Sequence, residues 1–217
     1  MTRTELALMI DHTLLRPDAV PFDIETICSE SIEYGFASVC INPIWVSLAN
    51  IILKEAGPFV CSVVGFPLGA TNCMVEETAG AIENGASEID MVMPAGYLKN
   101  GDNLKVAEFI RGVVNAASGR PVKVIIETCL LTDNEKILAC NIAMDNGAAW
   151  VKTSTGFGSA GAKEEDVALM HKTVQGRLGV KASGGIRTLE DALSMINAGA
   201  GRLGCSRSID IVEALDF

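Results

Sequence analysis

The segment GVKASGGIRTLEDALSMINAGAGRLGCS, residues 179–206, holds in one stretch the unit that repeats along the chain. A short apolar run ends in polar residues and two glycines. A longer amphipathic stretch then begins at Thr188, a residue type that caps helix N-termini, and it has acidic residues in its first turn. That stretch ends in glycine, the usual C-terminal stop of a helix, and a second apolar run follows. The segment therefore predicts a strand, a helix and a second strand in succession.

Outward from this segment, the same alternation extends over the whole chain. Short apolar runs typical of strands occur at residues 9–15, 37–43, 59–67, 88–94, 122–128, 150–156, 179–185 and 201–206. Amphipathic stretches typical of helices lie between them, at residues 21–35, 75–86, 104–118, 132–148, 163–176 and 188–200. Strands that alternate with helices, without a long linker, predict an α/β protein with a (β/α)8 TIM barrel as a single domain over residues 1–217.

The competing architecture is an open doubly wound sheet. Such a sheet normally has about five or six strands and a glycine-rich turn after the first one. The sequence MIDHTLLRPD, residues 9–18, has no glycine at that place. The strand count and the missing turn both favour the barrel.

Composition limits the classes of partner. The chain has 217 residues, of which 49% are hydrophobic and 20% charged, so it can bury a sizeable core. Its formal net charge of −10 argues against nucleic acid or an anionic membrane as the main partner. A small anionic ligand is still compatible, because a local site can be positive on an acidic protein. We expect a homodimer or another homo-oligomer that acts on small molecules.

The seven cysteines are scattered, and no CxxC or Cys/His spacing is typical of a zinc site, so we expect no metal and no cofactor. Most lie in apolar surroundings, where a free thiol behaves as a small hydrophobe, and this favours a reducing compartment. The N-terminus lacks the apolar run of a signal peptide, and no stretch approaches the roughly 20 apolar residues that span a bilayer. These features predict a soluble cytoplasmic protein.

Two lysines lie inside strand-like runs, Lys152 in WVKTSTG and Lys181 in GVKASGG. The small residues and glycines that follow each lysine place the two at similar heights in adjacent strands. A buried ammonium group is unfavourable unless it is paired or gives up its proton. Two such groups close together repel, so one should be neutral near pH 7, and a neutral lysine is a nucleophile toward carbonyls. Asp90 in EIDMVMP can balance one charge and move protons.

The alternative interpretation of these polar residues is a structural layer of ion pairs inside the barrel. Strand side chains alternate with a period of two, so Lys123 and Glu127 share a face. A Lys123–Glu127 pair and Lys–Asp contacts would then neutralise one another. Both interpretations stay open for Lys123, whereas for Lys152 and Lys181 we favour chemistry.

Glycines after the last two strand candidates indicate a phosphate site. Gly184 and Gly185 follow the seventh, Gly204 and Ser206 follow the eighth, and Arg187 adds possible charge. Loops after strands seven and eight of a barrel frequently bind phosphate through backbone N–H groups, with a helix N-terminus behind them. Glycine also serves ordinary turns, so the position of these residues in the fold carries the hypothesis.

Three further residues have two interpretations each. His12 follows an acid at the end of the first strand, where it either joins a site or hydrogen-bonds a neighbouring loop. Cys40 either borders the site or is a buried thiol. His171 lies in an amphipathic stretch and is expected to be structural or exposed.

Segments along nearly the whole chain together resemble the deoxyribose-phosphate aldolase family: IDHTLL, SVCINP, VVGFPLG, EIDMV, VKVIIET, VKTSTGFG and VKASGGIRT. The two lysine segments are the most specific. The resemblance implies a (β/α)8 barrel that reversibly cleaves 2-deoxy-D-ribose 5-phosphate to D-glyceraldehyde 3-phosphate and acetaldehyde without a metal, in deoxyribonucleotide catabolism. It also places the Schiff-base lysine at Lys152, the second lysine at Lys181 and the acid/base carboxylate at Asp90.

The chain departs from the family's pattern at two positions. Arg207 replaces the second of two serines that usually follow the glycine of the eighth strand. Pro94 stands where an asparagine is common. The first departure bears on the phosphate site, to which an arginine can itself contribute.

Two other functions are compatible with the pattern. One is a different Schiff-base aldolase, or an isomerase, that acts on a phosphosugar. The other is an inert barrel that serves as a binding module. An inert relative should have lost one of the three catalytic candidates, and this sequence retains Lys152, Lys181 and Asp90.

Overall fold

The computed structural model describes residues 1–216 and contains a closed barrel of parallel strands. Each strand is hydrogen-bonded to the next one along the chain, and β8 closes the ring against β1. The strands are β1 (Ile10–Leu14), β2 (Ser38–Ile41), β3 (Phe59–Val64), β4 (Glu88–Val92), β5 (Val122–Ile125), β6 (Trp150–Lys152), β7 (Gly179–Ser183) and β8 (Arg202–Cys205). The predicted (β/α)8 barrel is therefore confirmed, and the open sheet is excluded.

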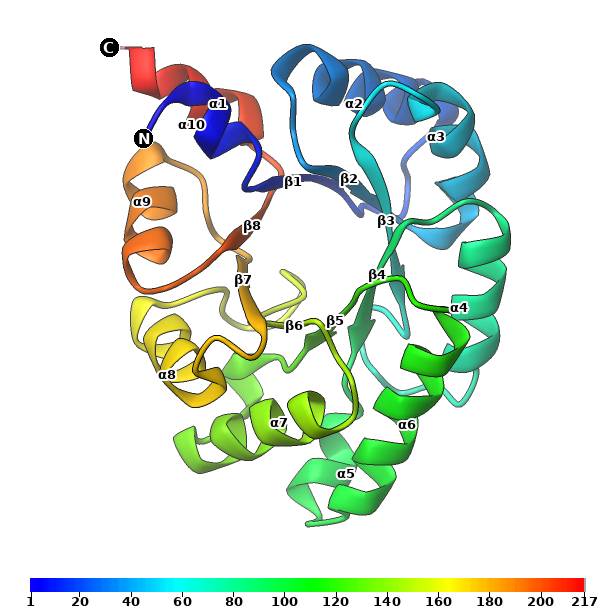
Figure 1. Cartoon of the computed structure of the whole chain (residues 1–217), viewed down its shortest axis with the longest axis vertical. Helices are drawn as coiled ribbons and strands as arrows, with labels where there is room; N and C mark the ends of the chain where they lie inside the picture. Colours follow the sequence, from blue (N-terminus) through cyan, green and yellow to red (C-terminus); the bar gives the residue numbers. More distant parts are fainter. Residues whose placement is uncertain (217) are drawn as a thin grey trace.

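The helices surround the ring of strands (Figure 1). They are α1 (Arg3–Ala7), α2 (Pro21–Tyr34), α3 (Val46–Leu53), α4 (Met74–Glu83), α5 (Ala95–Lys99), α6 (Asn103–Ala116), α7 (Asp133–Asp145), α8 (Glu164–Val174), α9 (Leu189–Asn197) and α10 (Ser208–Glu213), with short 3-10 turns η1 (Pro43–Trp45), η2 (Thr128–Leu130) and η3 (Ala214–Asp216). Figure 1 also shows the two chain ends side by side, where α1 meets α10. Across residues 1–216, the helices are too short or too polar to traverse a lipid bilayer.

Helix boundaries follow the capping residues that the sequence indicates. Thr132 and Thr188 each accept a hydrogen bond from the backbone N–H three residues on, at the starts of α7 and α9. The acids at those positions, Glu135 and Asp191, accept from the cap N–H groups in return, so both helices begin with a complete capping box. Helix α2 ends at Gly35, whose φ of 69° suits the residue without a side chain.

Some elements differ from the sequence-based prediction. Strand β5 ends at Ile125, and the expected extension to residue 128 is wrong because Glu127 has a left-handed φ of 52° and begins the turn η2. Helix α3 was not predicted, since its sequence VSLANIIL is apolar almost throughout and lacks an amphipathic period. Helix α5 has five residues, too few for a period to be recognised.

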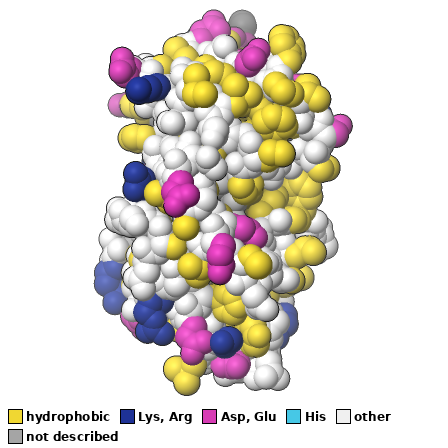
Figure 2. Space-filling model, turned by 90° about the vertical axis from the view of Figure 1, so that its right-hand side faces the viewer, with side chains coloured by type: hydrophobic (Ala, Val, Ile, Leu, Met, Phe, Trp, Pro, Cys, Tyr) yellow, Lys and Arg dark blue, Asp and Glu magenta, His cyan; other side chains and the backbone are white. Residues whose placement is uncertain are grey.

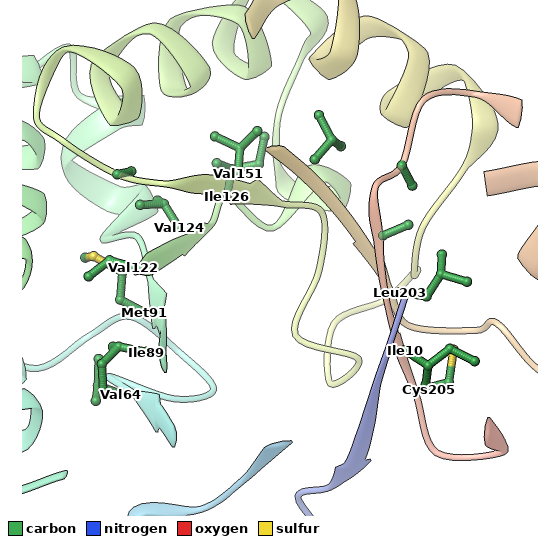
Figure 3. Close-up of a cluster of buried hydrophobic side chains, with 14 of the residues drawn as sticks. Ile10, Val64, Ile89, Met91, Val122, Val124, Ile126, Val151, Leu203 and Cys205 are labelled. Atoms are coloured by element: carbon green, nitrogen blue, oxygen red, sulfur yellow. The ribbon is translucent and has the colours of Figure 1, made fainter. Parts of the chain in front are cut away.

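The strands present apolar side chains to the helices. Alternate residues such as Ile89 and Met91 on β4, or Val122 and Val124 on β5, are fully or almost fully buried. Figure 3 shows these side chains on the outer side of the strands, between the barrel and its helices. Burial of this layer removes apolar surface from water and holds the helices on the barrel.

The other alternation of residues is polar and points into the barrel. Asp90 on β4 contacts Lys181 on β7, a strand three places away in the ring, and such a contact is possible only across the interior. The register places Asp90 beside Lys123 and Lys152 beside Lys181. The barrel therefore has an apolar outer layer and a charged inner one, and the period-two alternation of each strand separates them.

The indole of Trp150, the first residue of β6, lies beside two glycines at the N-terminal end of the barrel. Trp150 pairs in register with Gly179 on β7, and a Cβ at Gly179 would overlap atoms of the indole ring. The ring also lies next to Gly201, just before β8. The ring can therefore lie across β7 because these neighbouring positions have no side chains.

We expect Gly179→Ala to lower the free energy of unfolding by about 1–3 kcal/mol, because the added methyl group must displace the indole of Trp150. Urea titration followed by circular dichroism measures the change. Gly80→Ala on α4 is the matched control, since no atom lies within 4 Å of its would-be Cβ, and it should stabilise the protein by about 0.5–1 kcal/mol. Equal effects of the two substitutions would contradict the packing argument.

Candidate active site

A cavity of about 320 Å³ lies at the C-terminal end of the barrel, where the loops after the strands meet. Its lining includes Lys152 and all of the residues predicted for the phosphate site: Gly184, Gly185, Arg187, Gly204 and Ser206. A larger, shallow depression of about 1070 Å³ lies between α8 and α9, but its lining contains no lysine and no predicted site residue. The smaller cavity is the candidate site because it combines a buried amine with glycine-rich loops.

The Asp90 carboxylate holds Lys152 and Lys181 together. Its Oδ2 atom accepts a hydrogen bond of 2.7 Å from the Nζ atom of each lysine. All three side chains are buried, with side-chain exposures of 3% for Lys152 and 0% for the other two. The expectation that the lysines lie in adjacent strands at equal height is confirmed by their pairing in register. Both amines therefore share one carboxylate oxygen in the buried interior.

Lys123 is paired, but not as predicted. Its Nζ atom lies 2.5 Å from Oε2 of Glu88 and 2.9 Å from Oδ1 of Asp90. The structural interpretation named Glu127 as the partner, and that part of it is wrong, because the turn after β5 carries Glu127 away from the inner face. Glu127 instead accepts a hydrogen bond from the hydroxyl of Thr155 at 2.5 Å. Lys123 is thus part of the interior ion-pair network, as the structural interpretation held.

Asp11 extends the network toward the N-terminal end of the barrel. Its Oδ2 atom forms an ion pair with Lys181, and its Oδ1 atom accepts a 2.8 Å hydrogen bond from Nη1 of Arg202. No role for this acid, which directly precedes His12, is predicted from the sequence. Its position on the inner face of β1, next to β8, makes it the second carboxylate that contacts Lys181.

The network determines which groups keep their charge. Burial alone would raise the pKa of Asp90, but Lys123, Lys152 and Lys181 outweigh it and hold that pKa well below its usual value. Burial alone would lower the pKa of Lys181, but Asp11 and Asp90 outweigh it, and the pKa is raised. In the substrate-free protein at neutral pH, Lys181 is therefore held as a cation and Asp90 as an anion.

The count of charges leaves one cation in excess. In the part of the chain that the structure describes, the network contains three carboxylates and four basic groups. The carboxylates belong to Asp11, Glu88 and Asp90, and the basic groups to Lys123, Lys152, Lys181 and Arg202. If one amine is neutral, the positive and negative charges of the network are equal in number. This state is favoured because an unbalanced buried charge is costly.

Two thiols border the network. Cys40 and Cys61 are register partners on β2 and β3, and Sγ of Cys61 lies 3.1 Å from Oδ1 of Asp90. These sulfur atoms and an Asp90 oxygen lie within 4.8 Å of one another, close enough to hold a metal ion. The ammonium groups around Asp90 oppose a further cation there. Cys40 is thus both buried and adjacent to the site.

Glycine is required at the cavity for a different structural reason at each position. Gly184 and Gly185 have φ values of 87° and 83°, in the left-handed region that favours glycine. A Cβ at Gly185 would meet no atom within 4 Å, so this turn faces open space. A Cβ at Gly204 would lie 2.9 Å from Cβ of Ser183 and 3.2 Å from Cε of Lys181. Gly204 therefore also makes room for the second lysine.

The arginines predicted near the phosphate lie in different places. Arg187 lines the cavity and is exposed. Arg207, the residue that departs from the family's pattern, occupies the N-cap position of α10 without a side-chain cap hydrogen bond and lies outside the cavity lining. Arg16, which the sequence analysis missed, lines the cavity from the loop after β1. Arg16 begins the segment RPD, which directly follows the first strand. That position was the available signal for a site residue, since site residues of barrels follow strands.

Glu127 is a second residue that the sequence analysis misjudged. Its carboxylate accepts from both the hydroxyl and the backbone N–H of Thr155, which lines the cavity. The carboxylate therefore holds the loop that follows Lys152.

The histidines lie apart from the amines. His12 is buried on the outer side of the barrel, where its ring nitrogens contact Glu30 at 2.8 Å and Ser208 at 2.9 Å. Burial outweighs the contact with Glu30 and lowers the pKa of His12. His171 lies exposed on α8. The interpretation of His12 as a partner of neighbouring segments agrees with these contacts.

Comparison with known proteins identifies relatives over nearly the whole chain. A family model described as DeoC/LacD family aldolase matches residues 5–209. The deoxyribose-phosphate aldolase of Clostridium kluyveri is 57% identical over 216 residues, which cover 98% of this chain and 99% of the relative. That of Natranaerobius thermophilus is 54% identical over 217 residues, 99% of each chain. The solved deoxyribose phosphate aldolase of Aeropyrum pernix, described as a tetramer, has a TM-score of 0.93 at 32% identity, covering 99% of this chain and 92% of that one.

Proposed function

The chain belongs to the DeoC/LacD family of aldolases, and we propose that it is a class I deoxyribose-phosphate aldolase. It reversibly cleaves 2-deoxy-D-ribose 5-phosphate to D-glyceraldehyde 3-phosphate and acetaldehyde. The observation that carries the mechanism is the buried amine of Lys152, which reaches the cavity while bonded to a carboxylate shared with a second lysine. The reaction belongs to deoxyribose phosphate catabolism.

Lys152 is the proposed Schiff-base residue. Its neutral amine attacks C1 of the ring-opened sugar, and loss of water from the carbinolamine gives a protonated imine. Removal of the proton from the C3 hydroxyl breaks the C2–C3 bond, and its electron pair moves toward the imine nitrogen. D-Glyceraldehyde 3-phosphate leaves first. Protonation at C2 and hydrolysis then release acetaldehyde and the free amine. None of these steps requires a metal or another cofactor.

Lys181 and Asp90 are the proposed partners of this amine. Lys181 keeps its charge and lies next to Lys152, and a neighbouring cation is a known way to activate a nucleophilic lysine. Neutral Lys152 also leaves the interior network with equal numbers of cations and anions. Asp90 contacts both amines and can relay protons during carbinolamine dehydration and C3 hydroxyl deprotonation, directly or through water.

The phosphate is proposed to bind at the loops after β7 and β8. Gly184, Gly185, Gly204 and Ser206 line the same cavity as Lys152, and their backbone N–H groups and the Ser206 hydroxyl are the proposed donors. Arg187 adds positive charge at this edge. Binding energy from the non-reacting phosphate end positions C1 against the amine, so it acts on the rate as well as on affinity.

We also propose that residues 1–217 act as one catalytic domain in a homo-oligomer. Figure 2 shows hydrophobic side chains gathered on the side of the barrel that carries α3 and α4. Ile44 and Ile51 are 76% and 74% exposed there, and Val75 on α4 is 41% exposed. Clustered apolar side chains at a protein surface are typical of an interface. We place the enzyme in the cytoplasm, where a reducing environment keeps its seven free cysteines reduced.

Lys152→Arg should abolish cleavage of 2-deoxy-D-ribose 5-phosphate, because a guanidinium stays protonated and cannot form an imine. It should also abolish the borohydride-trapped adduct with acetaldehyde, which peptide mass mapping locates in the wild type. Lys172→Arg, an exposed position on α8, is the matched control and should leave both unchanged. Substantial turnover by the Lys152 variant would refute the assignment.

Gly185→Val should reduce kcat/KM far more for the phosphorylated sugar than for unphosphorylated deoxyribose, because the new side chain blocks approach to the backbone. In the wild type we expect the phosphate to contribute about 2–4 kcal/mol, from two or three charge-assisted hydrogen bonds. The ratio of kcat/KM for the two sugars measures this contribution. Gly176→Val is the control for backbone strain, since it has a similar φ of 75° and no atom within 4 Å of its would-be Cβ, away from the cavity. An equal fall for both sugars would make the Gly184–Gly185 turn merely structural.

The wild type should sediment at a multiple of its 22.9 kDa chain mass. Ile51→Glu should shift the equilibrium toward the monomer, because it places a charge in the apolar surface of α3. Leu104→Glu on α6 alters an equally exposed side chain, 80% exposed, outside that surface and should not change the assembly. A wild type that sediments as a monomer at micromolar concentration would refute the oligomer.

A further inference from the structure

A chain of contacts runs from the N-terminal end of the barrel to the reactive amines. We propose that Arg202 is a positioning residue of this aldolase: it holds Asp11 against Lys181 and supplies the positive charge that keeps Lys152 neutral. The inference rests on the proposed Schiff-base function. Arg202 is not among the residues that line the cavity, so it acts through Asp11 and not on the substrate.

Asp11 is the link between the two ends. Its carboxylate is fully buried, and its two oxygens bind different cations, Arg202 through Oδ1 and Lys181 through Oδ2. Lys123 is the next nearest cation, at 3.9 Å from Oδ2. If Arg202 were absent, Asp11 would be free to rotate toward the two lysines. Arg202 therefore determines how the negative charge of Asp11 is divided between Arg202 and the two lysines.

Arg202 is itself held in place by the indole beside it. Its guanidinium lies over the ring of Trp150, 5.6 Å from the ring centroid, a geometry typical of a cation–π contact. The ring reaches Arg202 across β7 because Gly179 has no side chain. The side chain of Arg202 is 15% exposed, so little water competes for the guanidinium. The contacts therefore fix both the position and the charge of Arg202.

The charge of Arg202 affects the protonation of Lys152 because both groups belong to one buried set of positive and negative charges. The inner face carries titratable groups from every strand: Asp11 on β1, Cys40 on β2, Cys61 on β3, Glu88 and Asp90 on β4, Lys123 on β5, Lys152 on β6, Lys181 on β7 and Arg202 on β8. With Arg202 present, three carboxylates face three cations when Lys152 is neutral. Without Arg202, the same balance requires a proton on Lys152. Loss of this one distant cation should therefore favour the unreactive form of Lys152.

The test compares Arg202→Gln with Arg202→Lys in the dependence of kcat/KM on pH. The glutamine keeps a hydrogen-bond donor for Asp11 but removes the charge, whereas the lysine keeps the charge. We expect the acidic limb for Arg202→Gln to move to higher pH by about one unit, a loss of about tenfold on that limb, with activity recovering at high pH. Arg202→Lys should show little of this shift, because the lysine keeps the positive charge. Lys181→Leu removes a cation next to Lys152 and should shift the limb in the same direction.

Lys136→Met is the matched control. Lys136 is a buried cation on α7, bonded to Asp166 on α8 and separate from the interior network. Its loss should lower the melting temperature without moving the pH profile. Trp150→Leu is a second test that retains every charge. By releasing the guanidinium, it should shift the limb in the same direction by less, and it decides the question if Arg202→Gln does not fold.

Two different failures can be distinguished. If the wild type does not cleave 2-deoxy-D-ribose 5-phosphate, the proposed function is wrong. If the wild type is active but Arg202→Gln loses activity equally at every pH, as a merely destabilised variant would, the proposed role of Arg202 is refuted. A profile for Arg202→Lys that matches that of Arg202→Gln would also refute it, because the charge would then not matter.

Discussion

Three buried lysine side chains donate to the single carboxylate of Asp90, and the rest of the active site is arranged around this contact. A lone ammonium in a dry interior is strongly unfavourable, and one carboxylate cannot balance three. Glu88 and Asp11 supply the remaining negative charge, each from a strand that the closed ring brings close. The barrel is therefore a scaffold that confines charges of both signs, in nearly equal number, to one small volume.

This arrangement requires that one face of each strand packs against the helices and the other carries the charged groups. The outer face carries residues such as Val124 and Val151, which bury apolar surface against the helices and supply the stability of the fold. The inner face is then free to carry charges, whose desolvation opposes folding. A one-residue slip of any strand would exchange these faces. Register is thus a requirement of the chemistry as well as of the packing.

Glycines make the dense interior possible. Gly204 leaves room for the stem of Lys181, and Gly179 leaves room for the indole of Trp150. In the loops, a Cβ at Gly161 would overlap the carbonyl of Gly184, so the segment after β6 lies directly against the turn after β7. That contact joins the loop that follows Lys152 to the loop proposed to hold the phosphate. The same residue type therefore serves packing at one end of the barrel and ligand approach at the other.

The sequence by itself determined the barrel, the pairing of Lys152 with Lys181 and the loops of the cavity, because strand alternation and chain order are local properties that survive into the fold. It could not identify the true partner of Lys123, since the turn at Glu127 interrupts the period of two. Nor could it join Asp11 to Arg202, which are 191 positions apart and meet only where β8 closes on β1. Only the closed ring decided which charges face each other, because contacts across its interior depend on the shape of the whole barrel and on no single segment.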